Sequence, residues 1–157
     1  LKKATGSESG SVNFTTSSSG YMAARVHRFQ AGTWKDTGTL TDSVEAASSY
    51  ARGVSSSPTA SSVTASWGSD DNFFVAMCSA ASAGSQTYPS GWADTGTQIS
   101  TDTMMMTATK SSTAAEEVPG AFGYSLAGAY VAYCIVVRGA ETVAEVGGGG
   151  IFFGAGF

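Results

Sequence analysis

Charged side chains are scarce in this sequence. Asp, Glu, Lys and Arg together make up 13 % of its 157 residues, about half of the roughly 25 % found in ordinary globular domains. Lys and Arg number only 8 and are scattered, so no basic stripe exists that could neutralise nucleic-acid phosphates or bind an anionic membrane surface. We therefore expect neither a nucleic acid nor a membrane as a partner.

Long apolar runs are missing too. The longest one, AYVAYCIVV at residues 129–137, is well short of the about 18 residues that a membrane-spanning helix needs. The first residues lack the basic-then-apolar pattern of a signal peptide, and the chain begins with Leu1 rather than Met, as expected of a processed, trimmed or partial sequence. Disorder is not expected, because hydrophobic residues reach 42 % and aromatic residues are spread along the chain.

Histidine occurs once and cysteine twice, which leaves few residues for catalysis or metal binding. His27 is the only candidate base, and the stretch GSESG at residues 6–10 has glutamate where a nucleophile elbow needs serine. We therefore predict no catalytic residue and an exposed histidine on a strand. Cys78 and Cys134 cannot form a metal site alone. Each lies in an apolar run, which is typical of a buried thiol, although neighbouring strands would allow a disulfide.

Two pairs of adjacent carboxylates are candidates for catalytic or metal-binding groups. Asp70 and Asp71 form one pair, and Glu116 and Glu117 the other. Neighbouring residues on a strand point to opposite faces, so neither pair forms the acid and base of a glycosidase. Asp70, Asp71 and Asn72 could join backbone oxygens and waters around Ca²⁺, but their spacing does not require it. The sequence thus predicts solvated turns, with no metal and no cofactor.

The apolar residues that are present alternate with polar ones, or come in runs of four to eight between clusters of Gly, Ser, Thr and Pro. This is typical of strands. We expect strands at residues 11–16, 21–29, 61–67, 73–78, 98–99, 103–109 and 129–137, a strand plus loop at 39–50, and loops at 52–62, 79–86 and 116–120. Met104 and Met106 should face one way and Met105 the other. About eight strands with frequent turns predict an all-β fold, an antiparallel β-sandwich that is jelly-roll-like.

The C-terminal stretch differs from the rest. We expect residues 1–140 to form the sandwich domain and residues 141–157 to form a glycine-rich apolar arm. Four glycines at 147–150 precede the large apolar side chains of the arm: Ile151, Phe152, Phe153 and Phe157. The glycine run lacks the Gly-Lys-Ser/Thr ending of a phosphate loop.

These arm side chains need a surface, either their own core or a neighbouring chain. Burying them would contribute about 6–12 kcal/mol at roughly 1.5–3 kcal/mol each. Ordering about eleven residues at roughly 1–2 kcal/mol each would oppose most of that. We therefore interpret the segment as an assembly arm whose backbone also pairs, for instance as an added strand.

Five motifs in a fixed order carry a resemblance. They are Ser66-Trp67-Gly68, the stretch DDNFFVA at residues 70–76, the stretch YPSGW at 88–92, the methionine-rich strand ending at Lys110, and IVVRG at 135–139. Over residues 60–140 the series resembles the β-sandwich structural proteins of tailed bacteriophages. Residues 1–50 share only a loose likeness, and the C-terminal segment has no counterpart in it.

The resemblance implies a non-enzymatic virion component: a capsid decoration or cement protein on the head, or a tail-associated module. The partners it implies are copies of the chain itself, as a homotrimer, and the major capsid protein or another virion protein. Its implied location is the virion, at the capsid surface.

Three aromatic residues support an alternative. Trp34, Tyr88 and Trp92 lie in expected turns, where flat rings can stack on sugars, as in a carbohydrate-binding module of a phage tail or fibre. The other interpretation is that they plug the core or anchor an interface, since Trp and Tyr are enriched in interfaces. A glycan therefore stays open as a ligand.

Overall fold

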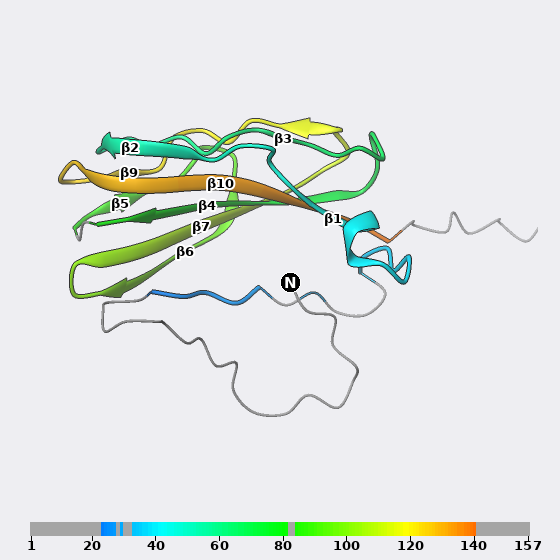
Figure 1. Ribbon diagram of the computed structural model, residues 1–157, viewed down its shortest axis with the longest axis horizontal. Helices are drawn as coiled ribbons and strands as arrows, with labels where there is room; N and C mark the ends of the chain where they lie inside the picture. The colour runs from blue at the N-terminus through cyan, green and yellow to red at the C-terminus, as the bar shows by residue number, and fades with distance from the viewer. Residues whose placement is uncertain (1–22, 28, 30–32, 82–83, 141–157) are drawn as a thin grey trace, which may run out of the picture.

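The computed structural model describes residues 23–27, 29, 33–81 and 84–140, and this part of the chain is all-β (Figure 1). A short 3-10 helix, η1 (Leu40–Asp42), precedes ten strands. The strands are β1 (Val44–Ala46), β2 (Ala51–Ser55), β3 (Val63–Thr64), β4 (Asn72–Ala80), β5 (Gln86–Thr87), β6 (Ala93–Ser100), β7 (Thr103–Ser112), β8 (Glu116–Glu117), β9 (Gly123–Tyr124) and β10 (Gly128–Arg138). No helix within these ranges is long and apolar enough to cross a membrane.

Six of the strands form one antiparallel sheet around β10. The order is β1-β10-β4-β7-β6, and β2 also pairs with β10. β1 pairs with the C-terminal half of β10, where Val44 lies opposite Val137. β2 pairs with its N-terminal half, where Val54 lies opposite Ala129. β10 can occupy this position because its β-branched and aromatic residues favour extended structure and cover both faces.

The inner face of this sheet forms the core. Its side chains come from the three long strands and are fully buried: Phe74, Ala76, Cys78, Met104, Met106, Ala108, Ala132, Cys134 and Val136. Two short sheets, β3–β8 and β5–β9, form a second layer, to which Val63, Phe122 and Tyr124 contribute buried side chains. Figure 1 shows β3 at the top of the view, and β5 and β9 at the left, beside β10 and β4. The predicted all-β antiparallel class is confirmed, with a sandwich-like arrangement that is not closed.

A buried asparagine ties the start of β4 to two loops. Asn72 is 2 % exposed. Its Oδ1 accepts a hydrogen bond of 2.7 Å from Trp67 Nε1, and its Nδ2 donates to the carbonyl of Ala114 at 2.8 Å. Gly68, in the turn between them, has φ 85°, a conformation that glycine adopts without a steric penalty. Residues of two of the five sequence motifs are thus joined by hydrogen bonds.

A third motif closes the same corner at the end of β10. Arg138 Nε donates to Asp70 Oδ2 at 2.7 Å, and the guanidinium lies 5.8 Å from the centre of the Trp67 ring. Gly139 donates its N–H to the carbonyl of Asp71, and a Cβ at residue 139 would overlap that carbonyl. The Trp-Gly, Asp-Asp-Asn and Arg-Gly motifs are therefore parts of one structural corner.

Several sequence predictions are confirmed. The strands expected at 73–78, 103–109 and 129–137 correspond to β4, β7 and β10, each longer than predicted. Met104 and Met106 are buried on the inner face, whereas Met105 faces the other way and is half-buried. These segments were predictable because their alternation is long enough to define a face.

Other predictions are wrong. Residues 52–55, expected in a loop, belong to β2, because β10 offers this segment an unpaired edge. Residues 116–117, also expected in a loop, form β8 opposite β3. In the predicted strand at 21–29, the described residues 23–27 and 29 belong to no strand. The predicted strand at 61–67 shrinks to β3.

Some predictions lie outside the described residues. They are the strand at 11–16 and the arm at 141–157 with Ile151, Phe152, Phe153 and Phe157.

Both cysteines are free and buried on the inner face. Cys78 lies opposite Ala132 and Cys134 opposite Ala76, so the two thiols sit on adjacent strands but are diagonal neighbours. Burial raises the pKa of each thiol to about 12. Of the two interpretations, the buried thiol is therefore the one observed.

Candidate functional site

The outer face of the six-stranded sheet is covered at one end only. The covering segment, here called the strap, consists of the described residues 23–27 and 29. It lies on the opposite side of the sheet from the second layer (Figure 1). The ring of Phe29 meets that of Phe73 edge to face, with centroids 5.2 Å apart. A side chain at Gly96 would overlap the Arg25 guanidinium, so Arg25 lies directly over β6.

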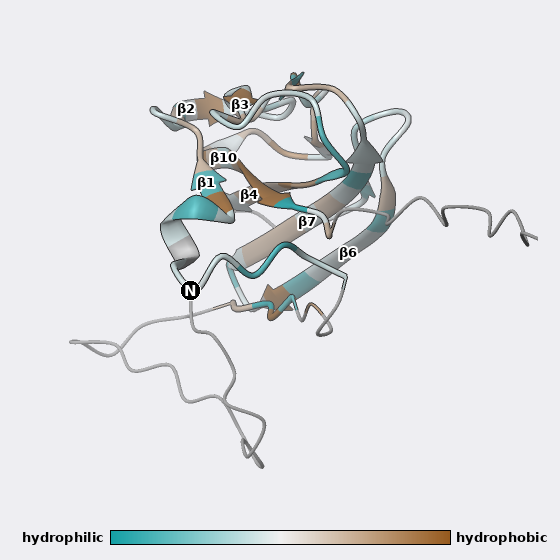
Figure 2. Ribbon diagram, turned by 90° about the vertical axis from the view of Figure 1, so that its right-hand side faces the viewer, coloured by the Kyte–Doolittle hydropathy of each residue, from teal (hydrophilic) through white to brown (hydrophobic). Residues whose placement is uncertain are grey.

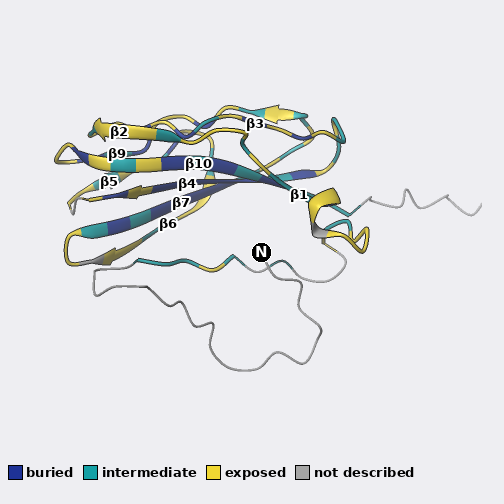
Figure 3. Ribbon diagram, viewed as in Figure 1, coloured by how far each residue is buried: buried dark blue, intermediate teal, exposed yellow. Residues whose placement is uncertain are grey.

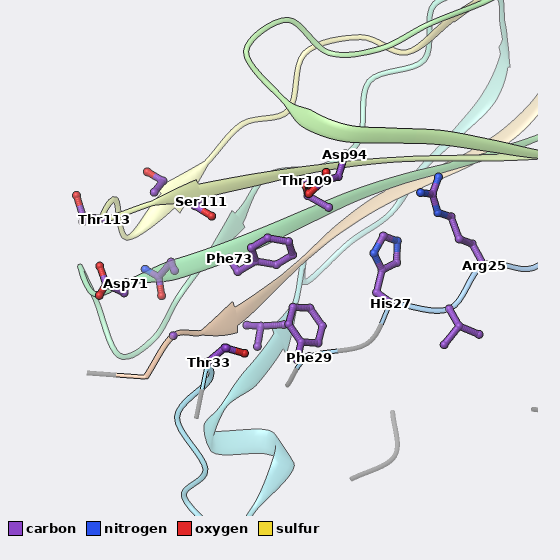
Figure 4. Close-up of a pocket in the computed structure, with 15 residues that line it drawn as sticks. Arg25, His27, Phe29, Thr33, Asp71, Phe73, Asp94, Thr109, Ser111 and Thr113 are labelled. Atoms are coloured by element: carbon purple, nitrogen blue, oxygen red, sulfur yellow. Dashed lines mark hydrogen bonds between the residues drawn. The ribbon is translucent and has the colours of Figure 1, made fainter. Parts of the chain in front are cut away.

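A cavity of about 990 Å³ separates the strap from the sheet. Arg25 and His27 line it from the strap, and Phe73, Asp94 and Thr109 line it from β4, β6 and β7 (Figure 4). The cavity thus combines a guanidinium, an imidazole, a carboxylate, a hydroxyl and an aromatic ring. This polar set next to an apolar surface is common in ligand sites.

His27 is half-buried on the strap rather than exposed on a strand, contrary to the sequence prediction. Its Nε2 is buried and has no hydrogen-bond partner within the described ranges. Burial lowers the pKa of His27 below its ordinary value, the positive charge of Arg25 lowers it further, and Asp94 opposes both. The imidazole is therefore neutral at pH 7.

The cavity does not assemble an activated nucleophile around His27. The Thr109 hydroxyl lies 3.3 Å from both the carbonyl of Ala93 and the carboxylate of Asp94. Its partners are thus on β6, while a nucleophile needs its base within hydrogen-bond reach. No group of three or more His, Cys, Asp or Glu residues in the described part of the chain could hold a metal ion.

The turn of Asp70, Asp71 and Asn72, considered above as a calcium site, forms part of the corner. Asp70 pairs with Arg138, and that hydrogen bond is the main cause that lowers the pKa of Asp70. Asn72 uses its side chain for Trp67 and Ala114. Their oxygens are therefore committed to the structure of the corner.

The other end of the outer face carries exposed apolar side chains on regular strands. Val54 of β2 is 76 % exposed and Val131 of β10 is 42 % exposed, and both point to the outer face, as does exposed Ala129. Tyr50, just before β2, is 56 % exposed. We call Tyr50, Val54, Ala129 and Val131 the β2–β10 patch. Figure 3 shows β2 as largely exposed, and Figure 2 shows apolar residues on it.

The three aromatic residues singled out from the sequence do not share one surface. Tyr88 and Trp92 are half-buried and pack against the inner core. The Tyr88 hydroxyl lies 2.6 Å from Thr97 Oγ1. Trp34 is half-buried and forms a β-bridge with Gly139 at the end of β10. The structure therefore places two of them at the core and one at the corner.

Sequence reasoning missed both the cavity and the patch. Arg25, Asp94 and Thr109 are far apart in sequence, and no motif links them. Val54 lies in a stretch rich in Ser and Gly, a composition that is typical of a loop. One signal was available: β10 is apolar on both faces, so each face needs a cover.

The fold and these two surfaces define a sandwich-like β-domain with one end of its main sheet exposed among the described residues. Comparisons of the chain with protein-family models, with curated proteins and with solved structures found no match.

Proposed function

We propose that this protein is a non-enzymatic structural subunit that associates with copies of itself. The observation that carries the proposal is the β2–β10 patch. Side chains such as Val54 and Val131 are held by strands, so little conformational entropy is lost when a partner covers them. Clustered apolar side chains that stay exposed on regular structure are typical of protein-binding surfaces.

The virion is the setting that the motif order favours. Three of the five motifs build the corner of Trp67, Asp70, Asn72, Arg138 and Gly139, so these motifs have a structural role in this chain. From that likeness we propose a capsid decoration or cement protein, present as a homotrimer, with residues 141–157 as its assembly arm. A tail-associated module is the nearest variant.

Sedimentation of the full chain tests the proposal. We expect an oligomer at micromolar concentration, and we expect deletion of residues 147–157 to abolish it while the far-ultraviolet circular dichroism and the cooperative melt persist. A full chain that remains monomeric, or a truncated chain that assembles normally, would contradict the proposal. Its location and copy number in an intact particle would test the virion assignment separately.

The cavity favours glycan binding as a second candidate function. Hydroxyl, carboxylate and guanidinium groups beside the Phe73 ring suit the alternating polar and apolar surface of a sugar. A glycan array should then show binding that His27→Ala and Asp94→Ala abolish, whereas Trp92→Ala, which changes a side chain packed on the core, is the comparison variant. Absence of any glycan signal for the unmodified chain would remove this candidate.

A further inference from the structure

The strap shows how this protein covers its outer face. An extended segment that belongs to no strand lies across the sheet and is anchored by one aromatic ring, Phe29 on Phe73. Beyond Arg25 the same face continues to Val131 and Val54, which remain exposed. A peptide with phenylalanine side chains would cover that remaining part in the same way.

We propose that the β2–β10 patch of one copy binds residues 151–157 of a second copy. The inference rests on the proposed function, since it assigns the two surfaces of the self-association. The segment reads IFFGAGF: four large apolar side chains, and small residues that permit close approach to a sheet. The patch offers three aliphatic residues and Tyr50, with Arg52 between Tyr50 and Val54 on the same face.

The charges at the two surfaces are complementary. Arg52 lies opposite Val131 on the outer face, and its guanidinium is 5.8 Å from the centre of the Tyr50 ring. Residues 141–150, which lead to the apolar segment, carry Glu141 and Glu145 and no basic residue. Arg52 therefore places one positive charge within the patch, and an acidic approach to that charge favours the encounter and orients it.

Distance favours a second copy over the same copy. Ala140 follows the end of β10 that is farthest from the patch, and Ala129 to Val131 lie about 30–36 Å from it at roughly 3.3 Å per strand residue. Residues 141–150 reach about 36–40 Å only when fully extended, and a glycine-rich chain of that length spans on average about 17–20 Å. Docking within one copy would therefore need an almost fully extended connection.

A matched pair of valine substitutions tests the patch in the full chain. Val54→Asp should raise the dissociation constant of the oligomer at least about tenfold. Val118→Asp, at a valine that is 67 % exposed in the second layer, should leave it unchanged. Both variants should melt like the unmodified chain, since both side chains are exposed. If the unmodified chain assembles and Val54→Asp assembles equally well, the docking inference is wrong while the proposed function stands. If the unmodified chain is monomeric, both the docking inference and the proposed function are wrong.

Disulfide trapping identifies the occupant. The native thiols are buried with pKa values near 12, so they can remain while Val54→Cys and Phe153→Cys are placed on separate copies. Mixing the two single variants under mild oxidation should give a disulfide-linked pair of chains. Mixtures of Val54→Cys with Phe14→Cys, which test the N-terminal segment, should not. A bond that forms only within a chain carrying both Val54→Cys and Phe153→Cys, or preferentially with Phe14→Cys, would overturn the proposal.

Discussion

The two ends of the outer face differ in how they are covered, although β10 runs through both. At the end near Val137 the strap lies over the sheet, and Val75, Thr107 and Val137 are almost completely buried. At the end near Ala129 the side chains of Val131 and Val54 are exposed. The difference shows that burial on this face depends on what lies across the sheet and not on the composition of the strands.

The inner face provides the reference for this comparison. There the central side chains of β4, β7 and β10 are completely buried, among them Phe74, Met106 and Cys134. A residue in the middle of β10 therefore faces a continuous core on one side or a position-dependent cover on the other. Four predictions test this difference, from the largest effect to the smallest.

Truncation on the inner face should be the most destabilising. Phe74→Ala removes a side chain with no exposure and should lower the free energy of unfolding by about 3–5 kcal/mol. The matched pair on β10 is Val136→Ala, expected to cost about 2–3 kcal/mol, against Val131→Ala at about 0.5–1 kcal/mol. Urea denaturation at concentrations where the chain is monomeric measures all three. Equal costs for the two valines would contradict the distinction between the faces.

Thiol reactivity should differ about 10³-fold between a buried thiol of the inner face and an exposed thiol of the outer face. Cys78 and Cys134 have pKa values near 12 because they are buried. At pH 8 their thiolate fraction, and hence their alkylation rate, should be about 10³-fold below that of an exposed thiol with a pKa near 8.5. The exposed comparison is a thiol placed by Val54→Cys, measured with iodoacetamide on the native protein. Fast alkylation of either native thiol would show that the inner face opens readily.

The strap should be coupled to the sheet through one aromatic pair. Phe29 and Phe73 meet edge to face, and such pairs contribute about 0.5–1.5 kcal/mol beyond the area they bury. A double-mutant cycle with Phe29→Ala and Phe73→Ala measures that coupling in the free energy of unfolding. Additive effects of the two substitutions would mean that the strap does not hold this end of the face closed.

The corner should weaken in acid. The hydrogen bond from Arg138 is the main cause that keeps the pKa of Asp70 below its ordinary value. The group binds protons less readily in the folded state, so its contribution is present above about pH 4, the unfolded value, and is lost as pH falls through the lower folded pKa. Asp70→Asn should remove about 0.5–1 kcal/mol at pH 7 and flatten stability below pH 4. An unchanged acid profile would show that the pair adds nothing.

Much of the main sheet could be predicted, and little of what lies across it. β4, β7 and β10 have long alternating patterns, so each strand defines its own two faces. β2 could not be found in this way, because its sequence ARGVS becomes a strand only beside the N-terminal half of β10. The strap was misread for the converse reason: its residues alternate like a strand but pair with none in the described structure.

The sequence by itself determined the all-β class, the three central strands, the burial of the two thiols and the inward direction of Met104 and Met106. Those properties follow from local alternation and from the transfer of apolar side chains out of water, which every strand carries in its own residues. The tertiary structure alone decided which end of the outer face is covered, where the cavity forms and which valines stay exposed. These depend on contacts between residues far apart in the chain, such as Arg25 with Gly96, and local pattern does not encode them.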